Sequence, residues 1–145
     1  MFRRLLADFV RAGESRTDRA GASGVLEAAE RLARAYSEAW SDVFLVSQLR
    51  LYRSWTPQER ERKVQADSLR RAGATAFSFD TESALRIWAE AARLSGSIQD
   101  TSGVARALGN MGAALYAMGH ADSASHHLTQ AYDAATTAGD FLTAA

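Results

Sequence analysis

Apolar residues recur at every third or fourth position along most of this chain, a spacing that places them on one side of a helix. Between these periodic segments lie two stretches that break the pattern. Residues 13–24 are polar and punctuated by glycine, and residues 95–99 form a short loop. The pattern predicts an all-α protein with helices over residues 2–12, 25–40, 43–54, 56–77, 80–94, 100–118 and 121–137.

Several helix ends carry their own signals. The run Thr56-Pro57-Gln58-Glu59 has a hydroxyl at the cap, a proline in the first turn and a carboxylate that can reach back. Gly119 and Gly139 follow the last two helices, where a left-handed residue commonly ends a helix. Asp140 then begins a helix that the sequence does not finish.

The last four of these helices repeat in sequence. Ala84, Trp88 and Ala91 align with Ala124, Leu128 and Ala131 at a shift of 40 residues. Leu69, Ala72 and Gly73 align with Leu108, Met111 and Gly112 at a shift of 39 residues, which leaves one residue of slack in the turn. Small residues at such positions let two helices cross closely, and a large apolar residue fills the space beside them.

These residues resemble a tetratricopeptide repeat. The better unit matches the family pattern at eight positions: Leu108, Met111, Gly112, Leu115, Gly119, Ala124, Leu128 and Ala131. The preceding unit matches more weakly, at Leu69, Ala72, Gly73, Ala76, Ala84, Trp88 and Ala91. The resemblance implies antiparallel helix hairpins stacked as a right-handed α-solenoid. Within a repeat region at 56–145, the two repeats would cover residues 64–97 and 105–138, followed by the start of an unfinished next helix. The helical region at 1–55 would act as a cap or as a degenerate hairpin.

The period of about 40 residues is similar to that of kinesin-light-chain-type arrays. With the phrase at 67–73, it also resembles bacterial signalling proteins that carry a CHAT protease-like domain. The resemblance therefore implies two alternatives. One is a non-catalytic scaffold that binds a peptide or helix. The other is a sensor or regulatory module of a larger bacterial protein with a CHAT effector or a transcription regulator. Two repeats and the start of a third also predict an apolar carboxyl-terminal end, with Phe141 and Leu142, through which copies could self-associate.

The family holds peptides in a concave groove lined by the first helix of each repeat. By position, the candidate groove residues here are Asp67, Arg70, Ala74, Phe77, Arg106, Asn110, Ala113 and Tyr116. Arg70 and Arg106 would fix a peptide carboxylate, and Phe77 and Tyr116 would contact apolar side chains. The asparagine-rich clamp of some family members is not matched, because Gly109 and Ala113 stand at lining positions.

Composition narrows the chemistry further. Thirty alanines and a single proline favour helix. The absence of cysteine excludes disulfides, cysteine nucleophiles and thiolate metal sites. Seventeen basic and 17 acidic residues balance, which argues against a nucleic-acid partner. No phosphate-binding glycine motif, catalytic constellation or membrane-spanning stretch is present in the sequence, so we expect a cytoplasmic protein with no enzymatic activity, cofactor or metal. Trp40, Trp55 and Trp88 are interpreted as core anchors.

Overall fold

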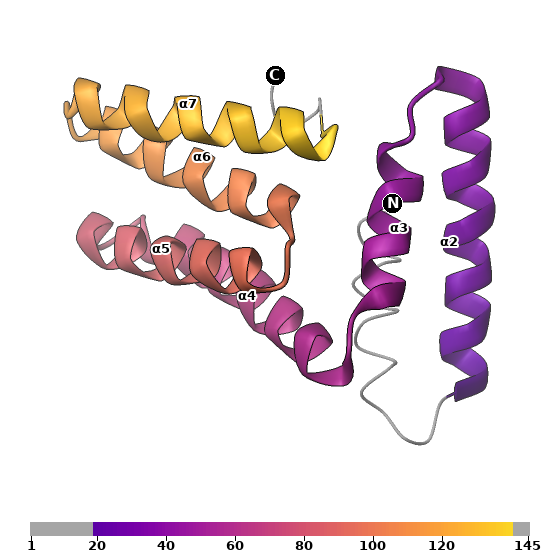
Figure 1. Cartoon of the computed structure of the whole chain (residues 1–145). Coiled ribbons are helices and arrows are strands. Elements are labelled where there is room, and N and C mark those ends of the chain that lie inside the picture. The colour runs from indigo at the N-terminus through magenta and orange to yellow at the C-terminus, as the bar shows by residue number, and fades with distance from the viewer. Residues whose placement is uncertain (1–18, 141–145) are drawn as a thin grey trace. The chain divides into compact units, whose positions relative to one another are not determined.

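The computed structural model describes residues 19–140, and all the regular structure in this range is helical. The helices are α2 Arg19–Trp40, α3 Phe44–Ser54, α4 Pro57–Ala76, α5 Thr81–Ser97, α6 Thr101–Ala117 and α7 Ala121–Ala138 (Figure 1). The all-α prediction is confirmed. The predicted helix at 2–12 and the apolar pair Phe141 and Leu142 lie outside the described residues. The chain divides after Val64 into two compact units, which we call the amino-terminal and carboxyl-terminal units.

In the amino-terminal unit, α2 and α3 pack side by side as a hairpin (Figure 1). The buried apolar residues of this unit are Ala29, Ala33, Phe44, Leu49, Tyr52 and Trp55. The rings of Tyr52 and Trp55 stack with their centroids 4.4 Å apart, which gives this small core an aromatic anchor. Trp55 thus has the core position that the sequence predicted.

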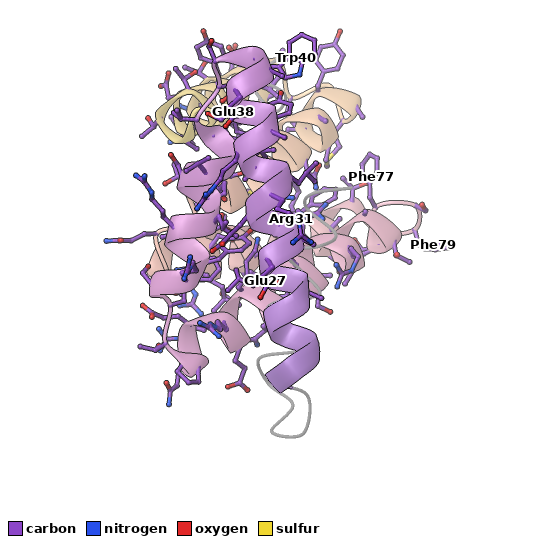
Figure 2. The ribbon with its side chains drawn as sticks, turned by 90° about the vertical axis from the view of Figure 1, so that its right-hand side faces the viewer. Glu27, Arg31, Glu38, Trp40, Phe77 and Phe79 are labelled. Carbon is purple, nitrogen blue, oxygen red and sulfur yellow. The ribbon has the colours of Figure 1, made fainter. Side chains whose placement is uncertain are left out.

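Two expectations for this hairpin are wrong. Helix α2 starts at Arg19, so residues 19–24 are helical rather than part of a polar loop. Ala20 and Ala22 are strong helix formers, and they offset the cost of the glycines in this segment. Trp40 is not a core anchor, because its side chain is 72% exposed at the end of α2 (Figure 2). Its ring instead contacts Tyr36, with centroids 6.5 Å apart.

Helix α4 begins with the capping box that the sequence predicted. The backbone N–H of Thr56 donates to the Glu59 carboxylate at 2.8 Å, and the N–H of Glu59 donates to the Thr56 hydroxyl at 3.3 Å. The bond from the Thr56 backbone N–H, followed by the bond from its hydroxyl, lowers the pKa of Glu59 below its ordinary value of 4.5. The cap therefore favours the ionised form of this carboxyl.

We expect Thr56→Ala to destabilise the first turn of α4 by about 1 kcal/mol, because a cap hydroxyl and its two hydrogen bonds are removed. Because the pKa of Glu59 is lowered in the folded state, its ionised carboxylate stabilises the folded helix above pH 4.5. This stabilisation is lost as the pH falls through the folded-state pKa. The difference in stability of the first turn between wild type and Thr56→Ala should therefore become smaller in acid. Amide hydrogen exchange in the first turn measures it, with Gln58→Ala as the exposed control. Equal protection in Thr56→Ala and Gln58→Ala would contradict the prediction.

In the carboxyl-terminal unit, α6 lies between α5 and α7 (Figure 1). Helix α4 joins α5 through Trp88, whose indole Nε1 donates to the carbonyl of Arg70 at 3.0 Å. Ala84, Trp88 and Ala114 form a buried cluster, and Ala76, Leu85 and Met111 pack against it. One aromatic residue of α5 is thus covered by both α4 and α6.

Glycine and a large apolar residue meet at the same place in both hairpins. A Cβ added at Gly73 would lie 2.4 Å from Nε1 of Trp88, and one added at Gly112 would lie 2.7 Å from Cγ of Leu128. Neither position has room for a side chain as its neighbour now stands. The two hairpins therefore share a close helix crossing at the residues that align in the sequence.

The segments that follow α5 and α7 also correspond. Each contains a left-handed residue, Gln99 with φ 59° and Gly139 with φ 70°, and a buried aspartate comes next. The N–H of Asp100 donates to the Ser95 carbonyl at 2.9 Å, and that of Asp140 donates to the Ala135 carbonyl at 2.8 Å. Helix α5 continues through Ser97, three residues beyond the predicted end at Leu94, so the expected loop is shorter than the sequence suggested.

The carboxylates of both aspartates bind the first turn of α6. Asp100 caps α6 by accepting the N–H of Gly103 at 3.0 Å. Asp140 accepts the Ser102 hydroxyl at 2.7 Å, which ties the end of α7 to the start of α6. Because both aspartates are buried, the Asp100 bond fixes how α6 follows α5, and the Asp140 bond holds the open end of the α6–α7 hairpin together.

Candidate interaction surface

The predicted groove residues fall into two rows, and we call the surface they form the α4–α6 face. One row follows α4 and ends at Phe77, the first residue after this helix, and the other lies on α6. Their spacing of three or four residues places each row on one side of its helix. The first row is Asp67, Arg70, Ala74 and Phe77, and the second is Arg106, Asn110, Ala113 and Tyr116. Nη2 of Arg106 lies 4.0 Å from Oδ1 of Asp67, so the two rows meet at this end.

The Asp67–Arg106 pair is partly buried, with side chains that are 19% and 18% exposed. Nε of Arg106 also donates to the Ser102 carbonyl at 3.3 Å. Arg106 is therefore held in place by its own chain rather than extended into solvent. This pairing was not predicted from the sequence. Asp67 and Arg106 are 39 residues apart, which is the shift that aligns the first helices of the two repeats. Their opposite charges at equivalent positions were the signal that could have predicted the pair.

The middle of each row holds one exposed alanine and one half-buried polar residue, Arg70 on α4 and Asn110 on α6. Ala74 on α4 and Ala113 on α6 are both exposed, so a partner could approach the helix backbones closely here. Asn110 is half-buried beside Ala113 on the same helix, and it brings the one neutral amide of the two rows. The centre of the α4–α6 face therefore combines two small exposed residues with one arginine and one neutral amide.

Aromatic residues stand at the other end of the rows. Phe77 is 38% exposed, and its ring lies 5.9 Å from the ring of Trp88, centroid to centroid. Tyr116 is 72% exposed. Phe79, in the α4–α5 turn, is 89% exposed and was not among the predicted site residues (Figure 2). Large exposed aromatics are typical anchors of protein interfaces, because they bury much area at a low entropic cost.

A cleft of about 470 Å³ lies between α6 and α7, and we call it the α6–α7 cleft. Its lining residues are Tyr116, Ala121, Ala124, Ser125, Leu128, Thr129 and Tyr132. Of these, only Tyr116 was predicted from the sequence as a site residue. The apolar spacing from Leu128 to Tyr132 on α7 was available as a signal, but the alignment of Leu128 with Trp88 suggested a buried position.

The amino-terminal unit carries a smaller cleft of about 170 Å³ between α2 and α3. Three arginines line it together with a carboxylate and an apolar floor: Arg34, Arg50, Arg53, Glu30, Ala33, Val46 and Leu49. Arg53 forms an ion pair with Glu30. Figure 2 shows further charged residues, Glu27, Arg31 and Glu38, along the exposed side of α2.

The histidines of α7 stand apart from these surfaces. The rings of His126 and His127 meet edge to face with centroids 5.7 Å apart, and Nδ1 of His127 lies 2.9 Å from the Ser123 carbonyl. Within residues 19–140, no three histidine, aspartate or glutamate side chains come together as a metal ion would require. None of the helices from α2 to α7 is both long and apolar enough to span a bilayer.

Comparison with protein-family models, with curated proteins and with solved structures finds no match to this chain. Any assignment of function therefore depends on the surfaces described above.

Proposed function

We propose that this chain is a non-catalytic protein-interaction scaffold of the tetratricopeptide-repeat type, and that the α4–α6 face binds a peptide or helix of a partner protein. The observation that carries the proposal is the arrangement of the two rows. The Asp67–Arg106 pair joins them at one end, and exposed aromatics occupy the other end. Exposed alanines stand in the middle beside the half-buried Arg70 and Asn110.

The chemistry of the face suggests the chemistry of the partner segment. Backbone and small side chains would lie over Ala74 and Ala113, where little protrudes from the helices. An apolar side chain would pack against Phe77 and Tyr116, whose exposed rings are the main source of binding energy. An acidic side chain would reach the guanidinium of Arg106 beside Asp67, since arginine presents five N–H donors.

The repeat geometry supports the tetratricopeptide part of the proposal. Both hairpins cross at an aligned glycine, Gly73 or Gly112, against a large apolar residue of the second helix. The segments after α5 and α7 also match in backbone conformation at Gln99 and Gly139. A stack of such hairpins presents its first helices side by side, which would make α4 and α6 one binding surface.

The test uses three exposed alanines that all lie in helices. Some proteins of a cell extract should be retained by the wild-type chain. We expect Ala74→Arg and Ala113→Arg each to reduce the amount of these proteins that is retained at least about 10-fold, because the added side chain blocks the α4–α6 face. Ala89→Arg, on α5, is the matched control and should retain the same proteins as wild type. Binding constants of the purified partner, measured by calorimetry, then give the size of the effect.

Tyr116→Ala should weaken the same complex by about 5–30-fold, the range expected for removal of one aromatic anchor. If the proteins retained by wild type bind Ala74→Arg and Ala113→Arg equally well, the α4–α6 face is not the binding surface and the proposal is wrong.

A further inference from the structure

The smaller cleft of the amino-terminal unit, which we call the α2–α3 cleft, has an apolar floor and a charged rim. Its lining residues are spaced as one side of each helix: Glu30, Ala33 and Arg34 on α2, and Val46, Leu49, Arg50 and Arg53 on α3. Ala33 is 1% exposed and Leu49 is 6% exposed, so they form the floor. Arg34 and Arg50 are exposed and stand at the rim.

The rim of the α2–α3 cleft carries more positive than negative charge. Three arginines and one glutamate give the lining a net charge of +2. Glu30 is the one acidic residue of this lining, and it already forms the ion pair with Arg53. Within residues 19–140, neither Arg34 nor Arg50 forms an ion pair with a carboxylate. The described part of the chain therefore leaves these two charges without a counter-ion.

The Glu30–Arg53 ion pair shows which positions of the two helices lie opposite each other. Residues 41–43 connect α2 to α3, and the chain reverses its direction there (Figure 1). Arg34 lies four residues from Glu30 toward this connection, or about 6 Å along α2. Arg50 lies three residues from Arg53 toward the same connection, or about 4.5 Å along α3. Arg34 and Arg50 therefore stand at nearly the same level of the cleft, about one turn from the ion pair.

Two arginines at one level of a cleft repel each other unless an anion lies between them. The guanidinium group of arginine is planar and presents five N–H donors, an arrangement that matches pairs of oxygens on phosphate or carboxylate groups. An anion between Arg34 and Arg50 would remove the repulsion and accept hydrogen bonds from both helices. The two arginines thus favour an anion as the occupant of the α2–α3 cleft.

The charge and the size of the cleft indicate which anion fits. A phosphate monoester carries about −1.5 to −2 at pH 7, which balances the lining better than the single charge of a carboxylate. The volume of about 170 Å³ suits one small group, because sites for drug-sized ligands measure about 300–1,000 Å³. The apolar floor of Ala33, Val46 and Leu49 would pack against the carbon stem of an ester, which inorganic phosphate lacks.

We propose that the α2–α3 cleft binds a phosphate monoester, with Arg34 and Arg50 holding the phosphoryl oxygens from the two helices. This group occurs on phosphorylated serine side chains of proteins and on small free esters. The site belongs to the amino-terminal unit and shares no residue with the α4–α6 face. It is therefore a second binding site, and it is independent of the proposed peptide-binding function.

Binding to the full chain is measured by nuclear magnetic resonance, through the Nε–H signals of the arginines, with N-acetyl-O-phosphoserine amide as the probe. We expect saturable shifts with a dissociation constant of about 1 mM or below. Arg34→Gln and Arg50→Gln should each raise this constant at least about 10-fold, because each removes a charged donor of the phosphate. Arg31→Gln is the matched control and should leave the constant unchanged, since Arg31 is an exposed arginine of α2 that does not line the cleft (Figure 2).

The variants should keep the helix content of wild type by circular dichroism, because the replaced side chains are exposed. Arg50→Lys retains the charge but not the planar group, so it should bind the probe with an affinity between those of wild type and Arg50→Gln. Lack of saturable shifts at about 20 mM probe would overturn the proposal. Equal weakening by Arg31→Gln and Arg34→Gln would also overturn it, because the attraction would then come from overall charge rather than from this cleft.

Further probes test the chemical class and separate the two sources. Dimethyl phosphate, a diester with one negative charge, should bind at least about 5-fold more weakly than N-acetyl-O-phosphoserine amide, and equal binding would contradict a monoester site. Tighter binding of a short peptide with a central phosphoserine than of glycerol phosphate would support a phosphorylated partner protein as the source. The reverse order would support a small free ester. If neither ester binds more tightly than inorganic phosphate, the apolar floor plays no part and the proposal is wrong.

Discussion

Trp88→Ala is expected to lower the free energy of unfolding of the carboxyl-terminal unit by about 3–5 kcal/mol, the range for removing a large buried aromatic side chain. The indole is 3% exposed, and it is the largest member of the cluster with Ala84 and Ala114. The substitution leaves a cavity between helices α4, α5 and α6. It also removes the donor to the Arg70 carbonyl, so this partly buried acceptor loses its bond from Nε1.

The matched variant is Leu128→Ala, at the aligned position of the next hairpin. We expect a smaller loss of about 1–2 kcal/mol, because the Leu128 side chain is already 45% exposed and less apolar area is returned to water. Urea unfolding followed by far-ultraviolet circular dichroism gives the total change, and amide hydrogen exchange of α5 and α6 assigns it to this unit. Equal losses in the two variants would mean that Leu128 is as well covered in solution as Trp88.

The helices themselves were largely predictable, because each depends on local signals. The 3.6-residue period of apolar positions fixed where they lie, and the Thr56–Glu59 capping box appears in the structure with both reciprocal bonds. Errors occurred where local signals were weak. The glycines of residues 19–24 suggested a loop, but alanines continue the helix through them.

Burial was harder to predict than helix position, because it depends on neighbours that the local pattern does not contain. Trp40, Trp55 and Trp88 look alike as large apolar residues in or beside helices, yet Trp40 is 72% exposed and the other two are buried. Leu128 and Trp88 align in the repeat, but only Trp88 has a following helix over it among the described residues. Periodicity indicates which side of a helix is apolar, and it does not say whether anything packs there.

The candidate site could likewise be predicted only in part from the sequence. Helical spacing was enough to place the residues of each row on one side of α4 or α6, and the exposure of Ala74, Ala113 and Tyr116 agrees with a surface role. The pairing of Arg106 with Asp67 required knowledge of which helices are neighbours. It changes the expected role of Arg106 from a free anchor to one that is already oriented by a carboxylate.

The tight crossing of α4 and α5 leads to a second large effect. Gly73→Ala should lower the free energy of unfolding by about 2 kcal/mol, although alanine is the better helix former by about 1 kcal/mol. The new Cβ would stand 2.4 Å from Nε1 and 2.6 Å from Cδ1 of Trp88. The indole is buried and hydrogen-bonded, so it cannot move aside without losing packing and its bond to the Arg70 carbonyl.

Two other glycines provide controls within the same unit. At Gly112 the nearest atoms to a new Cβ belong to Leu128, which is half exposed and can rotate, so Gly112→Ala should cost less than Gly73→Ala. At Gly109 the nearest atom is the Cβ of Ala131 at 4.0 Å, an ordinary contact, so Gly109→Ala should stabilise the unit by about 0.5–1 kcal/mol. Urea unfolding of the three variants should therefore give a loss, a smaller loss and a gain. A gain at Gly73 equal to that at Gly109 would show that α4 and α5 are farther apart in solution than this crossing requires.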